Sequence, residues 1–233
     1  MNTAPPAGSR PRLALFDLDH TLLQVDSDYS WGVFTTRIGW TDPHAFAERN
    51  EAFYRDYQAG TLDIHAYVRF ATEALRGRSR QQADAAHARF MHEVVLPAVP
   101  AVSRQLVRDH AEAGDITLIL TATNEFVTAP IAALFAVDDL IAVRLARDAG
   151  GAITGEIDGV PSVREGKVTR MAQWLAARGW GWADVQTTFY SDSINDLPLL
   201  ERVDTPVATN PDARLREIAL SRGWRVLDLF DKK

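Results

Sequence analysis

The segment LALFDLDHT, residues 13–21, decides the fold of this chain of 233 residues. Its first four residues form a continuous apolar run, which is typical of a strand buried on both faces of a parallel sheet. Two carboxylates follow at once, Asp17 and Asp19. Side chains alternate along an extended chain, so these two carboxylates point to the same side. The segment therefore predicts a buried strand that ends in a pair of acids.

A second acidic segment, YSDSIND at residues 190–196, repeats this arrangement near the other end of the chain. Asp192 and Asp196 follow another predicted strand, residues 186–190. Carboxylate oxygens are the ligands that Mg²⁺ prefers, and a carboxylate can also attack phosphorus as a nucleophile. Together the two segments indicate a magnesium-dependent enzyme of phosphoryl transfer.

The composition limits the classes of protein to which the chain can belong. Hydrophobic residues make up 46% and charged residues 24%, which predicts a packed core. The absence of cysteine excludes disulfides and thiolate ligands. A net charge of -6 argues against a nucleic-acid partner, and no apolar run approaches the ~20 residues that span a bilayer. We therefore expect a cytoplasmic protein that binds neither nucleic acid nor membrane, in an oligomeric state that the sequence leaves open.

The chain divides into a leader, a core and an insertion. Residues 1–11, rich in proline and alanine, predict a flexible leader. Residues 26–97 carry only helical signals, which predicts an all-α cap inserted directly after the acid pair. Residues 12–25 and 98–233 form the predicted catalytic core. An insertion at that point is well placed to cover the site and shape substrate entry.

Strands and helices alternate through the predicted core. This alternation predicts an α/β fold with a Rossmann-like parallel sheet and helices on both faces. A Gly150-Gly151 turn additionally predicts a hairpin over residues 140–157. In such sheets the site lies beyond the carboxyl ends of the strands, where the strand order reverses. The further expected elements are strands at 116–120, 205–208 and 224–227 and helices at 102–113, 126–135, 166–178, 194–201 and 212–221.

Four side chains have roles that the chemistry of phosphoryl transfer suggests. Asp17 is the candidate nucleophile, and Asp19 is placed to protonate the leaving oxygen and then to deprotonate water. Thr121 follows a predicted strand, where its hydroxyl and the next backbone N–H groups suit a phosphate oxygen. Lys167 opens a helix and is able to neutralise both the nucleophile and the phosphate. Each residue alone also fits a structural role, as a turn or helix-capping residue or as a solvated lysine.

The expected metal ligands are all oxygen atoms. Asp17 and Asp192 supply carboxylates, and Asp19 supplies its backbone carbonyl. Asp196 is expected to orient a ligand water from behind, and Asn195 to donate to phosphate. The alternative for the stretch 193–196 is an ordinary capping box, which would leave Asp192 without a role.

These segments resemble the four motifs of the haloacid dehalogenase-like hydrolases. The motifs are DLDHT at 17–21, the strand end at Thr121, Lys167 and SDSIND at 191–196. The resemblance covers residues 13–230, and it implies a mobile helical cap, a required Mg²⁺ and a nucleophile and acid/base at Asp17 and Asp19. The phosphate-binding hydroxyl of the second motif falls on Thr121, with Ala122 after it. An aspartate at position 17 also favours phosphatase over dehalogenase chemistry.

The position of the cap is similar to that in the phosphoserine phosphatase branch of this family. The chain departs from that branch by TAT at 121–123, where Ser-Gly-Gly is usual, and by Ser191 and Ser193 in place of two glycines. The substrate therefore stays open between a phosphoserine-like and a histidinol-phosphate-like compound. Both carry an ammonium group, and the acid that pairs with it in phosphoserine phosphatases falls near Asp26. Arg69 is one candidate among several for a carboxylate partner.

The expected function is hydrolysis of a small phosphomonoester through an aspartyl-phosphate. Transfer of the phosphoryl group to an alcohol acceptor is an alternative, because the same intermediate serves both reactions. A non-catalytic binding protein of the same fold is a further alternative. Such a protein would be expected to lack Asp17, Asp19 or Asp192, and all three are present.

Overall fold

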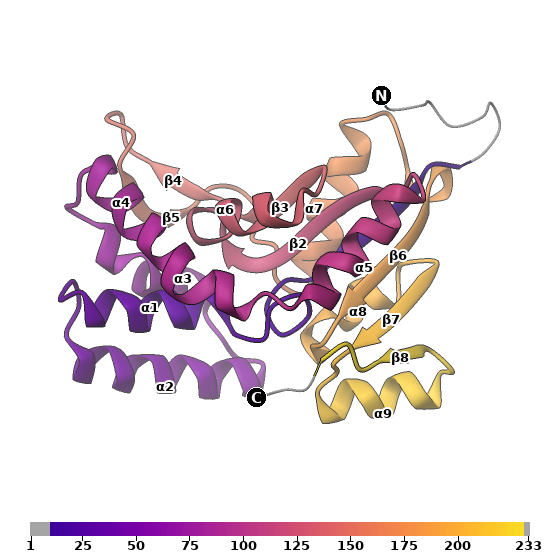
Figure 1. Cartoon of the computed structure of the whole chain (residues 1–233), viewed down its shortest axis with the longest axis horizontal. Coiled ribbons are helices and arrows are strands. Elements are labelled where there is room, and N and C mark those ends of the chain that lie inside the picture. Colours follow the sequence, from indigo (N-terminus) through magenta and orange to yellow (C-terminus); the bar gives the residue numbers. More distant parts are fainter. Residues whose placement is uncertain (1–9, 231–233) are drawn as a thin grey trace.

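A six-stranded parallel sheet forms the centre of the computed structural model, which describes residues 10–230 (Figure 1). The strand order is β3-β2-β1-β6-β7-β8, so the order reverses next to β1. All but two residues of the expected leader lie outside the described residues. The strands are β1 (Arg12–Phe16), β2 (Ile116–Asn124), β3 (Asp139–Val143), β6 (Gln186–Ser191), β7 (Thr205–Thr209) and β8 (Arg225–Leu227).

Strand β1 is apolar throughout its centre because both of its faces are covered. Leu13 and Leu15 pack into one hydrophobic cluster, whereas Ala14 and Phe16 pack into another on the opposite face. This alternation follows from the pleat of an extended strand. The predicted α/β fold is confirmed.

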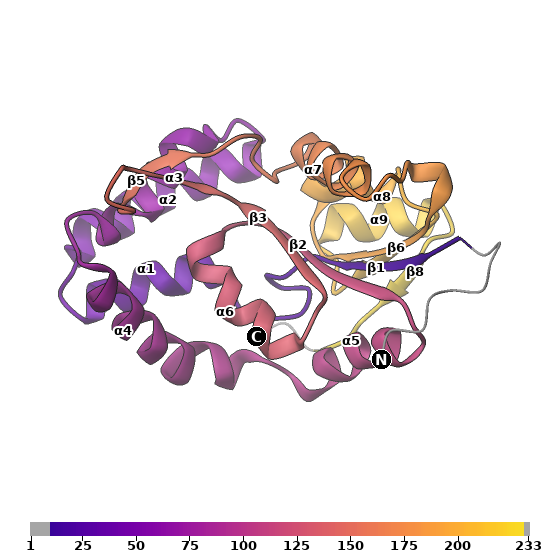
Figure 2. The ribbon, with the colours of Figure 1, turned by 90° about the horizontal axis from the view of Figure 1, so that it is seen from above.

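Helices cover both faces of the sheet, as Figure 2 shows. One layer contains α5 (Ala101–Glu112) and α6 (Glu125–Phe135). The other contains α7 (Glu165–Ala176), α8 (Leu197–Leu200) and α9 (Ala213–Ser221). A short 3₁₀ turn precedes α8, where the sequence predicted one continuous helix.

The insertion between β1 and β2 is helical and stands beside the core (Figures 1 and 2). Asp42 caps the second of its helices by accepting from the Ala45 N–H at 2.8 Å. Asp63 caps the third helix, because its carboxylate accepts from two backbone N–H groups that have no partner within the helix. The inserted helices are α1 (Ser27–Arg37), α2 (Pro43–Ala59), α3 (Ile64–Ala71) and α4 (Arg80–Phe90).

Two of the inserted helices pass into other helical forms at their carboxyl ends. Helix α3 stops before Thr72, whose hydroxyl donates to the Val68 carbonyl at 2.6 Å, and a 3₁₀ turn (Glu73–Leu75) follows. Helix α4 passes into a π-helical turn (Met91–Val95) and then a 3₁₀ turn (Leu96–Ala98). Pro97 explains this second change, because proline lacks the N–H of a helix interior.

The predicted hairpin over residues 140–157 is wrong in its first part. β3 pairs in parallel with β2 at the sheet edge, because Ile141, Ala142 and Val143 are buried in the core. Only β4 (Leu145–Arg147) and β5 (Ile153–Ile157) form the hairpin. The hairpin packs against α3, so the inserted helices have a small β-sheet beside them.

No helix within residues 10–230 is both long enough and apolar enough to cross a membrane.

Candidate active site

The acidic segments meet at the carboxyl ends of β1 and β6, next to the point where the strand order reverses. Asp17 continues the pairing of these strands, because its N–H donates to the Tyr190 carbonyl at 2.9 Å. Asp192 follows β6 directly. The local sequence thus places both carboxylates at the position where ligands bind in open α/β sheets.

A buried lysine joins the two acidic segments. Lys167 donates to Asp17 Oδ1 at 2.8 Å and to Asp196 Oδ2 at 2.7 Å, and it is only 1% exposed. Ser191 also donates to Asp196 Oδ2, at 2.7 Å. We call Asp17, Lys167, Ser191 and Asp196 the lysine cluster.

Lys167 keeps its charge in this buried position because the two carboxylates beside it outweigh the effect of burial. Burial alone would lower the pKa of the Lys167 ammonium, but the carboxylates of Asp17 and Asp196 raise that pKa. Burial raises the pKa of Asp196, although the lysine opposes the shift. The ammonium group thus places a positive charge beside Oδ1 of Asp17, the candidate nucleophile.

Thr21 connects the first and fourth motifs, and sequence reasoning assigned it no role. Its hydroxyl lies 3.1 Å from Asp17 Oδ2 and 3.3 Å from Asp192 Oδ1, and it accepts from the Asp192 N–H at 3.0 Å. The side chain is fully buried. The position of Thr21 in the first acidic segment was the one sequence feature that could have indicated this role, but a threonine at that position is equally typical of a turn.

The oxygen donors near Thr21 fit a magnesium ion. Carboxylate oxygens of Asp17 and Asp192 converge on one buried hydroxyl, and Mg²⁺ takes one or two carboxylates together with water and phosphate oxygens. Within residues 10–230, no three His, Asp or Glu side chains are grouped to hold a metal, and a magnesium site of this kind needs no such group. The expected contribution of the Asp19 carbonyl stays a prediction. Asp196 contacts Lys167 and Ser191, so its expected role beside a ligand water also stays a prediction.

Three further carboxylates, Asp19, Asp26 and Asp28, form what we call the acidic cluster. Asp19 accepts from the Ser27 N–H and from the Thr123 hydroxyl, both at 2.8 Å. These bonds fix a carboxylate that belongs to the first motif against both the insertion and the end of β2.

The other two members of the acidic cluster belong to α1 and its cap. Asp26 caps the helix by accepting from the Tyr29 N–H at 2.8 Å. Asp28 accepts from Asn124 Nδ2 at 3.2 Å and from the Tyr67 hydroxyl of α3. The cluster therefore connects α1, α3 and the core.

Burial and nearby negative charge raise the pKa values of two members of the acidic cluster, Asp19 and Asp28. Burial, together with the charge of Asp26, raises the pKa of Asp19 well above its ordinary value. The same two causes raise the pKa of Asp28 to about 7. A raised pKa suits Asp19 to the role of a general acid, which must hold a proton before it donates it.

The second motif lies in an irregular part of β2. The strand runs to Asn124, beyond the predicted end at residue 120, and its register against β3 shifts between Leu120 and Asn124. Asn124 caps α6, so the interpretation of Thr121 as an N-cap is wrong. The Thr121 hydroxyl accepts from the Thr123 N–H at 3.1 Å, and Ala122 lies between them, partly buried. Phosphate binding by Thr121 and Ala122 stays a prediction.

The fourth motif contacts groups that the sequence did not point to. Asn195 Oδ1 accepts from Arg164 Nη2 at 3.0 Å, and the Tyr57 hydroxyl of α2 lies 3.2 Å from Ser193 Oγ. Burial raises the pKa of Tyr57 to about 12, so its hydroxyl keeps its proton. Asp212 supports the same loop by accepting from the Ile194 N–H at 2.8 Å. These contacts join segments that are far apart in the chain, so no short stretch of sequence could predict them.

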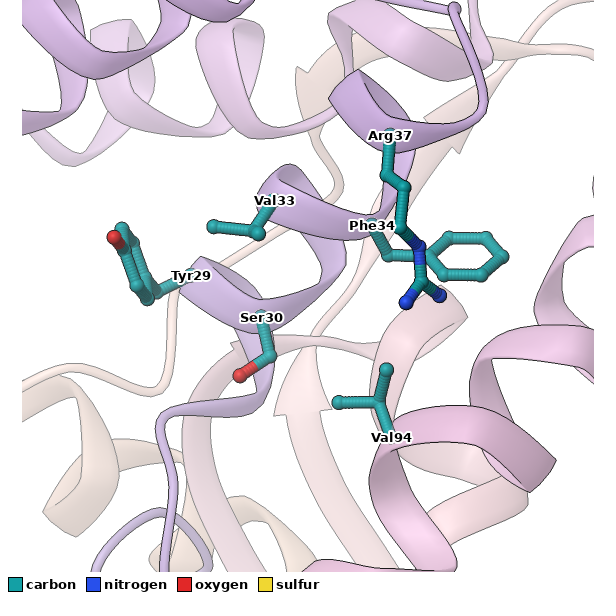
Figure 3. A pocket seen from close by; sticks show the side chains of 6 residues that line it. All are labelled: Tyr29, Ser30, Val33, Phe34, Arg37 and Val94. Atoms are coloured by element: carbon teal, nitrogen blue, oxygen red, sulfur yellow. The ribbon is translucent and has the colours of Figure 1, made fainter. Parts of the chain in front are cut away.

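Two surface features lie apart from these clusters. Arg69 pairs with Glu156 of the hairpin at 3.3 Å, and both side chains are about half exposed. A pocket on α1, shown in Figure 3, contains none of the predicted site residues. Its lining is Tyr29, Ser30, Val33, Phe34, Arg37 and Val94.

Comparison with known proteins places this site in a family. Residues 14–201 match the haloacid dehalogenase-like hydrolase family. A histidinol-phosphatase from Neisseria meningitidis serogroup C (strain 8013) is 44% identical over 217 residues, which cover 93% of this chain and 98% of that protein.

Solved structures show the same fold. A protein of unknown function from Bordetella pertussis Tohama I has a TM-score of 0.90 and 47% identity, and the match covers 95% of this chain and 100% of that one. A substrate-bound phosphoserine phosphatase has a TM-score of 0.66 at 16% identity, over 97% of this chain and 94% of that one, and supports the fold alone.

The match over most of the core, together with the relative that aligns almost end to end, establishes the family. The chain belongs to the haloacid dehalogenase-like hydrolases and is a phosphatase of that family.

Proposed function

We propose that this protein is a magnesium-dependent phosphatase for a small phosphomonoester that carries a protonated nitrogen, and that the reaction proceeds through an aspartyl-phosphate at Asp17. The observation that carries the proposal is that one first-motif segment places Asp17 beside the Lys167 ammonium and Asp19, whose pKa is raised, near the Asp26 carboxylate. The first arrangement suits phosphate and metal, and the second suits a leaving group that takes a proton and a cationic nitrogen that pairs with Asp26.

The reaction has two steps that use the same two carboxylates. A carboxylate oxygen of Asp17 attacks phosphorus, the bond to the ester oxygen breaks, and that oxygen takes the proton of Asp19. Asp19 then removes a proton from water, which attacks phosphorus and releases phosphate and free Asp17. Its bonds to Ser27 and Thr123 hold Asp19 in one orientation for both transfers.

The phosphate is held by cationic and hydrogen-bonding groups at the strand ends. Lys167 balances negative charge beside Asp17, and we assign the phosphate oxygens to the Thr121 hydroxyl, the backbone at Ala122 and the Asn195 amide. Asp17 and Asp192, with the Asp19 carbonyl, would hold Mg²⁺, which neutralises charge on the transferring group.

The acidic cluster favours a substrate with a cationic nitrogen. Asp26 caps α1 and Asp28 lies in the first turn of that helix, and we assign the leaving group of the substrate to this side of Asp19. Phosphoserine and histidinol phosphate both offer an ammonium group, but phosphoserine also needs a partner for its carboxylate. Arg69, the one candidate that the sequence named, is paired with Glu156. We therefore favour histidinol phosphate, the substrate class in the name of the Neisseria relative.

The test is phosphate release from histidinol phosphate, phosphoserine, a sugar phosphate and a nucleotide, with Mg²⁺ and with excess EDTA. We expect histidinol phosphate to have the highest kcat/KM and EDTA to abolish turnover. Asp17→Asn should lower kcat by on the order of 10³-fold or more, because it removes the nucleophile at nearly constant volume. A variant that keeps a tenth of the wild-type rate would rule out Asp17 as the nucleophile. Equal rates on all four esters would rule out the cation preference.

A further inference from the structure

The insertion touches the fourth-motif loop at the carboxyl end of α2. Tyr57 lies in the last turn of that helix, and its hydroxyl bonds to Ser193 Oγ and to the Asn195 side chain. Gly60 caps the same helix, and its carbonyl accepts from Arg164 Nη1 at 2.9 Å. Both contacts therefore reach the core within one turn of chain.

Arg164 spans the junction between insertion and core. Its Nη1 atom donates to Gly60, whereas its Nη2 atom donates to Asn195 Oδ1 at 3.0 Å. The guanidinium presents a planar fork of donors, so one side chain can fix two acceptors at once. A lysine at this position has no such fork.

The backbone of Arg164 supports a functional role for its side chain. Its φ of 52° and ψ of -122° lie in a region that residues other than glycine rarely adopt. Such strain costs of the order of 1–3 kcal/mol and gathers at functional sites. The turn is also tight at Gly166, where an added Cβ would lie 2.0 Å from the Pro161 carbonyl. The chain accepts an unfavourable conformation that directs Arg164 toward α2.

The contact with Arg164 sets the orientation of the Asn195 amide. A guanidinium has donors only, so the Asn195 atom beside it must be the carbonyl oxygen. The amide nitrogen then faces away from Arg164 and carries the N–H groups that can donate to Tyr57 and to phosphate. Without Arg164, the Asn195 amide can rotate and present its carbonyl oxygen to the phosphate. The two acceptors would then repel each other.

We propose that Arg164 and Tyr57 are positioning residues, which orient Asn195 for phosphate only while α2 is docked on the core. The inference rests on the proposed function, because it takes Asn195 as a phosphate donor. The inference adds that the insertion contributes to phosphate binding through the contact of α2 with Arg164 and Asn195. Gly60 completes the arrangement, since a Cβ there would lie 2.9 Å from Arg164 Nη2.

The test is a double-mutant cycle on the binding of inorganic phosphate, measured by calorimetry with Mg²⁺ present. Arg164→Lys and Tyr57→Phe should each weaken phosphate binding about 10- to 150-fold, the range for one hydrogen bond to a charged group. In an Asn195→Ala background, the same substitutions should have almost no further effect, because both act through that amide. Tyr54→Phe, on the exposed side of the same helix, is the matched control and should leave the affinity unchanged.

A second variant separates positioning from folding. Arg164→Gly removes the side chain and relieves the strained backbone, so it should lose phosphate affinity while its unfolding temperature holds or rises. Effects that add fully to Asn195→Ala would overturn the inference and leave the proposed function standing. A wild-type protein that binds no phosphate would overturn both.

Discussion

The lysine cluster and the acidic cluster bury carboxylates of the same first-motif segment, but they do so in opposite ways. In the lysine cluster, Lys167 lies within 2.8 Å of two carboxylates and keeps them paired with a cation. In the acidic cluster, burial and the charge of Asp26 raise the pKa values of Asp19 and Asp28. A buried acid is tolerated either with a counter-ion or with a proton. In the proposed mechanism, the acid with a counter-ion attacks phosphorus and the acid with a raised pKa transfers the proton.

Removal of the Lys167 cation should have the largest effect on stability, because the buried acids of the lysine cluster would then have no counter-ion. Lys167→Met keeps the volume but leaves Asp17 and Asp196 buried without a counter-ion. We expect a loss of about 3–5 kcal/mol in the free energy of unfolding at pH 8, measured by urea denaturation. The loss should be smaller at pH 5, because burial raises the pKa of Asp196 and its protonation relieves the repulsion. A loss below about 1 kcal/mol at pH 8 would show that the cluster does not need its cation.

Removal of a carboxylate from the acidic cluster should stabilise the folded protein. The pKa of Asp28 is about 7 in the folded protein and 3.8 in the reference state, so the folded state holds this proton more tightly. Stability therefore falls as pH rises from about 4 to 7, by up to about 4 kcal/mol from this one group. Asp28→Asn should remove this loss of stability, because an asparagine side chain does not titrate.

The measurement for Asp28→Asn is thermal unfolding at pH 4.5 and pH 8. The variant should gain stability relative to wild type at pH 8 and show little gain at pH 4.5. An equal gain at both values would mean that packing, and not the charge of Asp28, sets the difference. Asp42→Asn, at the exposed cap of α2, serves as a control for a carboxylate outside the cluster.

The smallest expected effect is a shift in the pH profile of catalysis. Asp26 raises the pKa of Asp19, second only to burial. Asp26→Asn should therefore lower the pKa of Asp19, and the basic limb of the profile should move to lower pH. The profile is to be recorded as kcat, with an ester that lacks a cationic nitrogen, so that substrate binding does not enter. An unchanged basic limb would mean that another group supplies the proton.

Local patterns predicted the parts of this molecule that depend on short stretches of sequence. The apolar run of β1 and the acids after it predicted both the sheet and the place of the site. The boundary between β3 and the hairpin was missed, because the run from 139 to 147 gives no sign of where the chain leaves the sheet. The contacts of Arg164 and Tyr57 were missed because each joins residues far apart in the chain. Thr21 was visible in the motif, but its bonds to two carboxylates follow only from the pairing of β1 with β6.

The central place of β1 has a consequence for synthesis of the chain on the ribosome. Leu13 pairs with Ile116 on one side and with Thr187 on the other. This strand, which precedes the candidate nucleophile, is thus made before the other strands of the sheet, yet it gains its second neighbour only after most of the chain has emerged. Until then, an apolar strand with an open edge is exposed to other nascent chains, the situation in which aggregation competes with folding. Recruitment of chaperones should be strongest on chains stopped between β2 and β6, a stage at which β6 and the fourth motif are not yet made.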